Sequence, residues 1–271
     1  RMAFELMDYG NLIVNNQVSQ SDKVGIYLQH GWNRILGNRF YSNCTDVYER
    51  NHSEYATQNI FTGNKFVESQ CSNTSISVRN AKPVIYQNGF LNAVGTAIVF
   101  NGDFGSSMLS QNNFIGNLSA INNRTVSTVK ADMNFWNSES GARGTDLLGL
   151  VSAEAWLDKA VISSAAFFQD TMYVPVNTET RIGLMVSRLD NESDIINVVF
   201  SDQNNWIKNT TVGSANVEIV GNVIFQSFQT PSVVGDGQGN QVYALTSSSN
   251  DIASNALDTA LIIPYVPDLS S

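Results

Sequence analysis

The chain has 271 residues, of which 42% are hydrophobic and only 14% are charged, and its formal net charge is −9 at pH 7. The hydrophobic content excludes wholesale disorder, and the acidic balance excludes nucleic-acid binding through a basic face. No apolar run reaches the ~18 residues that a membrane-spanning helix needs. The polar residues are instead mainly 32 Asn and 30 Ser. This composition favours β-structure with polar turns over a bundle of helices.

A repeat of 22 to 26 residues organises the first half of the chain. Each unit contains an apolar residue, an asparagine three positions later, and an apolar, usually aromatic, residue two positions after that. The asparagine column is Asn16, Asn38, Asn64, Asn88, Asn112 and Asn134. The column two positions later is Val18, Phe40, Phe66, Phe90, Phe114 and Trp136. The column three positions before is Ile13, Ile35, Phe61, Ile85, Leu109 and Ala131.

This period fits either leucine-rich repeats or a parallel β-helix. Leucine-rich repeats need several leucines per unit, and most of these units have one or two. The short alternating stretches, such as Ile26-Tyr27-Leu28, favour three strands per coil. Equivalent residues of successive coils would then lie about 4.8 Å apart, so we expect the phenylalanines to stack inside. We expect the asparagines at a corner, in a bridging or left-handed conformation, with their amides bonded to backbone and to the next coil.

The end of the repeat region carries a more specific motif. It reads Asn134-Phe135-Trp136-Asn137-Ser138-Glu139-Ser140-Gly141, followed later by Ala155-Trp156-Leu157. This resembles the final coil of the right-handed parallel β-helix, pectate-lyase-like superfamily, in its Asn-rich branch of bacterial and archaeal secreted and surface proteins. The departures from the branch pattern are Met133, Phe135, Asn137, Ala142 and Ala155. The resemblance covers residues 3 to 157 and implies the fold; it implies no particular activity.

The repeat stops near residue 157, so we predict two domains, a β-helix of about six coils over 1–157 and a β-sandwich over 158–271. A short capped helix is expected from Ser152 to Leu157, where Trp156 would help to close the β-helix. Turn-rich segments in the second half separate seven expected strands. They are Ala160–Phe168, Thr171–Val176, Arg181–Ser187, Ile195–Ser201, Ala215–Phe228, Gln241–Thr246 and Ala260–Val266.

A search for catalytic chemistry yields no candidate residues. The acidic residues do not recur at one position of the repeat, and the nearest cluster, Asp46 and Glu49 with Arg50, is expected to be a solvated turn. His30 lacks the neighbouring Asp pair of a pectin hydrolase, and the two His and two Cys lack the spacing of a zinc site. We therefore predict no catalytic residue, no metal site and no cofactor.

Calcium is kept as the only cofactor alternative. Asp190, Glu192 and Asp194 alternate as in a calcium loop. Ile195 and Ser201 replace the Gly and Glu that such a loop requires at its sixth and twelfth positions, so a chance turn is the preferred interpretation.

The two cysteines occupy nearly the same position in adjacent coils. Cys44 follows its repeat asparagine by six positions and Cys71 by seven. A disulfide could span them, which would indicate a location outside the reducing cytosol; the alternative is two buried free thiols. Candidate N-glycosylation sites, close to the number expected by chance, are Asn43, Asn51, Asn73, Asn117, Asn123, Asn191 and Asn209.

These features favour an extracellular or cell-surface structural protein that acts by self-assembly or adhesion, without catalysis. Its expected partner is itself or a surface carbohydrate. The alternative is a carbohydrate-binding or carbohydrate-active β-helix, similar to a polysaccharide lyase or hydrolase. No signal peptide is visible, so we expect a mature or cut form. Phe4 and Leu6 mark a candidate assembly end, to be covered by a neighbouring subunit or by preceding residues of a longer chain.

Overall fold

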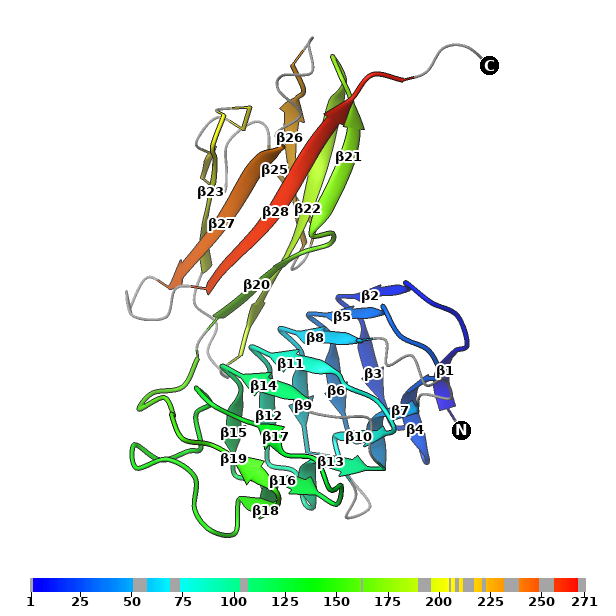
Figure 1. Cartoon of the computed structure of the whole chain (residues 1–271), viewed down its shortest axis with the longest axis vertical. Coiled ribbons are helices and arrows are strands. Elements are labelled where there is room, and N and C mark those ends of the chain that lie inside the picture. Colours follow the sequence, from blue (N-terminus) through cyan, green and yellow to red (C-terminus); the bar gives the residue numbers. More distant parts are fainter. Residues whose placement is uncertain are drawn as a thin grey trace. The chain divides into compact units, whose positions relative to one another are not determined.

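The protein is built from β-strands, and no helix forms in the part of the chain that the structure describes (Figure 1). The computed structural model describes residues 2–50, 58–68, 74–102, 107–161, 163–189, 196–204, 206–207, 210–211, 217–220, 223–231, 239–248 and 256–267. The chain separates into two compact units, residues 1–162 and 163–271. The sequence places the same division five residues earlier, after residue 157. The all-β class, with a parallel solenoid followed by a sandwich-like unit, is confirmed.

The first unit is a parallel β-solenoid with three sheets, each of which takes one strand from successive coils. Sheet 1 contains β1 (Met2–Leu6), β4 (Val24–Leu28), β7 (Thr45–Arg50), β10 (Ile76–Arg79), β13 (Thr96–Asn101), β16 (Ser119–Asn123) and β18 (Leu147–Gly149). Sheet 2 contains β2 (Leu12–Val14), β5 (Arg34–Leu36), β8 (Ile60–Thr62), β11 (Val84–Tyr86), β14 (Met108–Ser110), β17 (Val129–Lys130) and β19 (Val151–Ser152). Sheet 3 contains β3 (Gln17–Ser19), β6 (Arg39–Tyr41), β9 (Lys65–Val67), β12 (Gly89–Leu91) and β15 (Asn113–Ile115).

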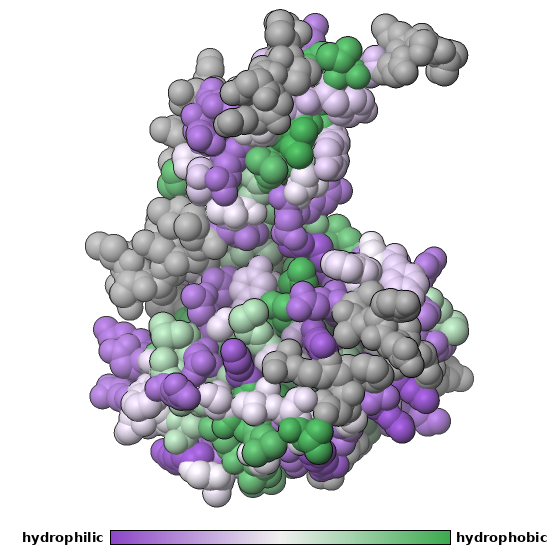
Figure 2. All heavy atoms as spheres, viewed as in Figure 1, coloured by the Kyte–Doolittle hydropathy of each residue, from purple (hydrophilic) through white to green (hydrophobic). Residues whose placement is uncertain are grey.

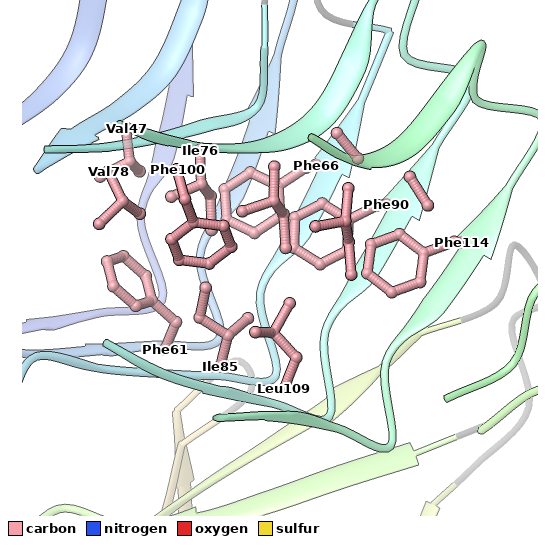
Figure 3. Close-up of a cluster of buried hydrophobic side chains, with 14 of the residues drawn as sticks. Val47, Phe61, Phe66, Ile76, Val78, Ile85, Phe90, Phe100, Leu109 and Phe114 are labelled. Atoms are coloured by element: carbon pink, nitrogen blue, oxygen red, sulfur yellow. The ribbon is translucent and has the colours of Figure 1, made fainter. Parts of the chain in front are cut away.

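Stacked aromatic rings fill the solenoid beneath sheet 3. Phe40, Phe66, Phe90, Phe114 and Trp136 follow one another with ring centroids 4.8 to 5.0 Å apart and planes within 9° of parallel. All five side chains are buried, and Figure 3 shows Phe66, Phe90 and Phe114 as a row beside Ile85 and Leu109. The parallel register places equivalent residues directly over one another, so the predicted stack of like on like is confirmed.

The repeat asparagines form an unbroken ladder along the solenoid, which we call the main ladder. From Asn16 to Asn112, each asparagine donates its backbone N–H and its side-chain Nδ2 to the Oδ1 of the next one, over 2.9–3.0 Å and 2.9–3.2 Å respectively. From Asn38 onward, Nδ2 also donates to a carbonyl of the preceding coil, over 2.7–3.0 Å. Those carbonyls belong to the apolar column that starts at Ile13. The three-residue offset between the two columns is therefore a hydrogen-bonding requirement as well as a packing one.

The left-handed residue at this corner is not the ladder asparagine itself. It is the residue immediately before it, with φ between 53° and 66° in every coil: Asn15, Gly37, Gly63, Gln87, Gln111 and Met133. The ladder asparagines themselves have no positive φ, so of the two expected conformations, bridging and left-handed, the left-handed one is excluded. The asparagine is required for its amide, and its neighbour makes the turn.

The second unit has a four-stranded sheet and a five-stranded sheet. The four-stranded sheet, in order, is β20 (Ser163–Phe167), β22 (Glu179–Arg188), β26 (Val223–Gln229) and β25 (Val217–Val220). The five-stranded sheet is β21 (Thr171–Pro175), β28 (Ala256–Tyr265), β27 (Asn240–Ser248), β23 (Ile196–Asp202) and β24 (Thr210–Thr211). Both sheets contribute to one core, which includes Phe167, Leu184, Phe200 and Ile262.

Two local expectations are wrong. No helix follows Ser152; that residue ends β19, and Trp156 instead bridges to Asn134 and donates its indole N–H to the carbonyl of Glu139. The strand expected over residues 215–228 is two strands, β25 and β26, which pair antiparallel. The apolar run that spans both strands concealed the break between them.

The main ladder predicts a position-dependent cost for losing one asparagine. Asn88→Ala leaves the backbone N–H of Asn64 and the carbonyl of Phe61 buried without these partners, at about 1–3 kcal/mol each. Asn16 is the first asparagine of the main ladder and is exposed, and no N–H or carbonyl of a preceding coil bonds to it in the described structure. Asn16→Ala should therefore lower the free energy of unfolding by clearly less. Urea unfolding followed by circular dichroism measures both, and equal costs would contradict this role for the ladder.

Candidate functional site

The first coil presents an apolar edge that no other strand covers in the described structure. Phe4 and Leu6 of β1 lie in register with Ile26 and Leu28, both of which are completely buried. Phe4 is nevertheless 44% exposed, and Leu6 is half-buried against the core. The two residues thus begin two inward-facing columns on the open side of the solenoid, as the sequence suggests.

The same edge carries hydrogen-bond acceptors in the pattern of an interior coil. A second ladder runs beside the main one, because Asn11 donates to Asn33 and Asn33 donates to Asn59 in the same two-bond manner. The Oδ1 atoms of Asn11 and Asn16 begin the two ladders. In the later coils, the equivalent Oδ1 atoms each accept two hydrogen bonds from the asparagine of the preceding coil. Sequence reasoning missed the second ladder, although these asparagines lie five positions before Asn16, Asn38 and Asn64.

Two carboxyl groups are buried inside the third coil, which contradicts the expectation of a solvated turn there. Asp46 and Glu49 of β7 are both inaccessible to solvent, whereas Arg50 at the end of the same strand is half-buried. Glu49 lies in register between Leu28 and Val78, in one of the apolar columns. The strand alternation that buries Val47 therefore also buries Glu49, two positions later.

Each buried carboxyl group accepts a hydrogen bond from an asparagine that also bonds to the preceding coil at a corner. Asn59, the last member of the second ladder, donates to Glu49 Oε1 over 2.9 Å, and Asn43 donates to Asp46 Oδ1 over 2.9 Å. Glu49 Oε2 and Asp46 Oδ2 are buried without a hydrogen-bond partner. Burial raises the pKa of Glu49 to about 8, although the hydrogen bond from Asn59 acts to lower it. Burial likewise raises the pKa of Asp46 to about 7, although the hydrogen bonds from Asn43 and Ser75 act to lower it.

A polar groove of about 370 Å³ lies on the outer surface of sheet 1. Tyr48 borders it, and its ring stacks on that of Tyr27 with centroids 5.4 Å apart. The other lining residues carry mainly hydroxyl, amide and guanidinium groups: Thr45, Thr74, Ser77, Thr96, Val99, Asn101 and Arg124. An aromatic face beside short hydrogen-bonding side chains suits a sugar better than a highly charged ligand.

The cysteine prediction is only partly visible. Cys44 is disulfide-bonded. Cys71, the other cysteine of the sequence and its expected partner, lies outside the described residues, so the Cys44–Cys71 pairing stays a prediction.

The glycosylation candidates divide into three groups. Asn43 and Asn123 are buried and each donates two bonds from Nδ2, which is incompatible with a glycan on that atom in the folded chain. Asn117 is half-buried and donates to the carbonyl of Phe90. Asn51, Asn73, Asn191 and Asn209 lie outside the described residues.

The remaining candidate residues are the alternating acidic residues of the second unit and His30 of the first. The calcium-loop candidates Asp190, Glu192 and Asp194 lie outside the described ranges. Within those ranges, no group of three or more His, Cys, Asp or Glu side chains is arranged to hold a metal ion. No helix there has the length and hydrophobicity needed to cross a membrane. His30 stacks on Tyr9, with ring centroids 4.5 Å apart, and has no Asp pair beside it.

The buried carboxyl groups predict stability that decreases as pH rises. Their folded pKa values lie above the ordinary values of 3.8 and 4.5, so the folded chain holds these protons more tightly than the unfolded chain. Their stabilisation is complete below about pH 4 and is lost as pH rises through about 7 to 8. Glu49→Gln should flatten the dependence of the unfolding free energy on pH, and Glu5→Gln, at an exposed position, should not. Parallel profiles for all three proteins would contradict this account.

Comparison with known proteins adds no relative to this picture. No family model, curated protein or solved structure matches the chain.

Proposed function

We propose that this chain is an extracellular structural protein that acts by assembly or adhesion, with the solenoid as a rigid shaft. The main ladder carries this proposal, because it joins every coil from Asn16 to Asn134 through repeated buried hydrogen bonds. A shaft of this kind keeps a fixed length and presents regular outer faces. The disulfide at Cys44 agrees with an oxidising, extracytosolic location. The resemblance of residues 134–157 to the final coil of Asn-rich β-helix surface proteins supports the same location.

Assembly would use the open edge of the first coil. Phe4 and Leu6 supply its apolar part, and Asn11 and Asn16 supply acceptors in the spacing that a further coil matches. A strand edge of this kind is a template for pairing with another chain. We propose that a second copy of the chain stacks there, so that the contact reproduces the coil-to-coil interface of the solenoid itself; the alternative occupant is a preceding coil of a longer chain.

Sedimentation velocity and electron microscopy of the 271-residue protein test the assembly. The native chain should form larger species as its concentration rises, and Phe4→Lys with Leu6→Lys should abolish them while the β-rich circular dichroism remains. Val126→Lys, at an exposed position between β16 and β17, is the matched control and should assemble normally. A native chain that stays monomeric at every concentration would refute assembly through this edge.

A second candidate function is carbohydrate binding or turnover in the groove of sheet 1. The stacked pair Tyr27 and Tyr48, beside the hydroxyl and amide groups of the groove, favours it. Isothermal titration with polygalacturonate and with soluble neutral glucans tests this candidate. Tyr48→Ala should then weaken binding, and Tyr9→Ala, at an exposed position outside the groove lining, should not. Release of unsaturated uronate from polygalacturonate would further identify a lyase; absence of both binding and cleavage would remove this candidate.

A further inference from the structure

The outer surface of the five-stranded sheet gathers the exposed hydrophobic side chains of the second unit. Along its strands, Val174, Val242 and Ile262 point into the core, and the residues between them point outward. The large hydrophobic residues described as exposed in this unit are Tyr173 at 69%, Val199 at 39%, Tyr265 at 43% and Val266 at 67%. All four lie in this sheet or directly after its strand β28. Figure 2 shows hydrophobic and near-neutral side chains over β21 and β28 on this face.

Strand register arranges the outward residues as one platform. Tyr173 lies opposite Ile263, and Tyr265 lies opposite Pro175, so the two tyrosines are diagonal neighbours on β21 and β28. Diagonal neighbours on a sheet face are about 7–8 Å apart, which long side chains can bridge.

The platform continues from β28 to a third tyrosine. Leu261 lies opposite Gln241, and Tyr243 lies opposite Thr259. The stretch of β28 from Thr259 to Tyr265 is about 20 Å long at the usual rise of a strand. We call Tyr173, Tyr243, Leu261, Ile263 and Tyr265 the tyrosine platform.

The surroundings of the tyrosine platform are uncharged and mainly polar. The outward positions beside it that the structure describes are Thr171, Pro175, Val199, Ser201, Gln241 and Thr259, with no Asp, Glu, Lys or Arg among them. The Tyr243 hydroxyl donates to Gln241 Oε1 over 3.0 Å, which orients this amide, and the Nε2 group of the amide can then donate to another acceptor. This face therefore offers aromatic surface with neutral donors and acceptors around it.

We propose that the tyrosine platform is a binding site for a neutral polysaccharide. The faces of tyrosine rings carry partial negative charge, which attracts the polarised C–H groups on the flat side of a pyranose ring. The threonine hydroxyls and the Gln241 amide then pair with sugar hydroxyl groups. The platform is long enough for several consecutive sugar rings. This inference rests on the proposed adhesive function and identifies the sandwich as the adhesive part and the glycan as its target.

The chemistry of the face distinguishes this ligand from two others. An anionic polymer would need cationic side chains near the rings, and the described outward positions contain none. A second copy of the chain is the competing occupant, because exposed tyrosines are also common at protein interfaces. Tyr173 lies beside Thr171, and Tyr243 lies beside Gln241 and Thr259. Separated rings with neutral hydrogen-bonding neighbours favour the repeating units of a glycan.

Depletion binding to cellulose and chitin particles tests the proposal with the full chain. The native protein should bind at least one of the two, with little dependence on salt. Tyr173→Ala with Tyr265→Ala should weaken binding roughly tenfold or more, given the usual strength of two aromatic contacts. Tyr173→Phe with Tyr265→Phe keeps both ring faces and should retain most of the binding. Circular dichroism and thermal melts check that each variant is folded.

The controls assign each outcome. Tyr9→Ala, which removes an exposed tyrosine of the first unit outside the groove lining, is the control and should leave particle binding unchanged. Tyr48→Ala tests the groove of sheet 1 in the same assay; if it abolishes particle binding while the platform variant retains it, the groove is the glycan site and the platform proposal fails. Absence of binding to both particles also overturns the proposal. A platform variant that changes the sedimentation coefficient but not glycan binding identifies a contact between copies and likewise overturns it. If the Phe4→Lys and Leu6→Lys variant loses assembly but still binds the particles, the platform proposal stands. Failure of glycan binding and failure of assembly are therefore distinguishable.

Discussion

The hydrogen bonds between equivalent asparagines are the constraint on which the rest of the solenoid depends. A parallel strand can shift along its neighbour by two residues and keep the same side chains inside, so burial alone does not fix the register of a coil. The main ladder does fix it, because each Asn Oδ1 accepts two bonds from one particular residue of the preceding coil. With this register set, Phe66 lies over Phe40 and Ile85 lies over Phe61. The aromatic stack and the aliphatic columns are therefore consequences of the corner.

The third coil departs from the pattern in which the inward-facing strand residues of the solenoid are apolar. Its strand β7 contributes Asp46 and Glu49 to the interior, and both carboxyl groups accept from asparagines that hold corners together. The second ladder ends at Asn59, because Pro83 occupies the equivalent position, five residues before Asn88, in the next coil. Glu49 supplies an acceptor where that ladder loses its next asparagine. A carboxyl group that keeps its proton there fits a column of apolar neighbours better than an ionised one does.

The sequence predicts those features that repeat. The six asparagines and the rings two positions later have one spacing and one physical reason, so the stack could be derived before any coordinates. The burial of Glu49 could not, because the variable segment that precedes each strand of sheet 1 hides which residues align with β7. The left-handed position cannot be located from the pattern, because asparagine suits both the ladder and a left-handed turn, and Gln87 and Met133 do not look like turn residues. In the second unit, β25 and β26 form one apolar run with only Gly221 and Asn222 between them, and this short turn signal was overlooked. The tyrosine platform needed the pairing of β21 with β28, which no local pattern indicates.

The unequal length of the two ladders has a mechanical consequence. Bonds of both ladders point from coil to coil, so tension along the shaft loads successive interfaces in series. The interfaces among the first three coils are joined by the bonds of Asn11, Asn33 and Asn59 in addition to those of the main ladder. Among the described residues, later interfaces carry other side-chain bonds in their place, such as Gln87 to Gln111 and Asn117 to the carbonyl of Phe90. A chain in series yields at its weakest link. The order in which the coils separate under axial load would therefore follow the side-chain bonds that each interface carries beyond the main ladder, so that the shaft is graded along its length although its coils share one outline.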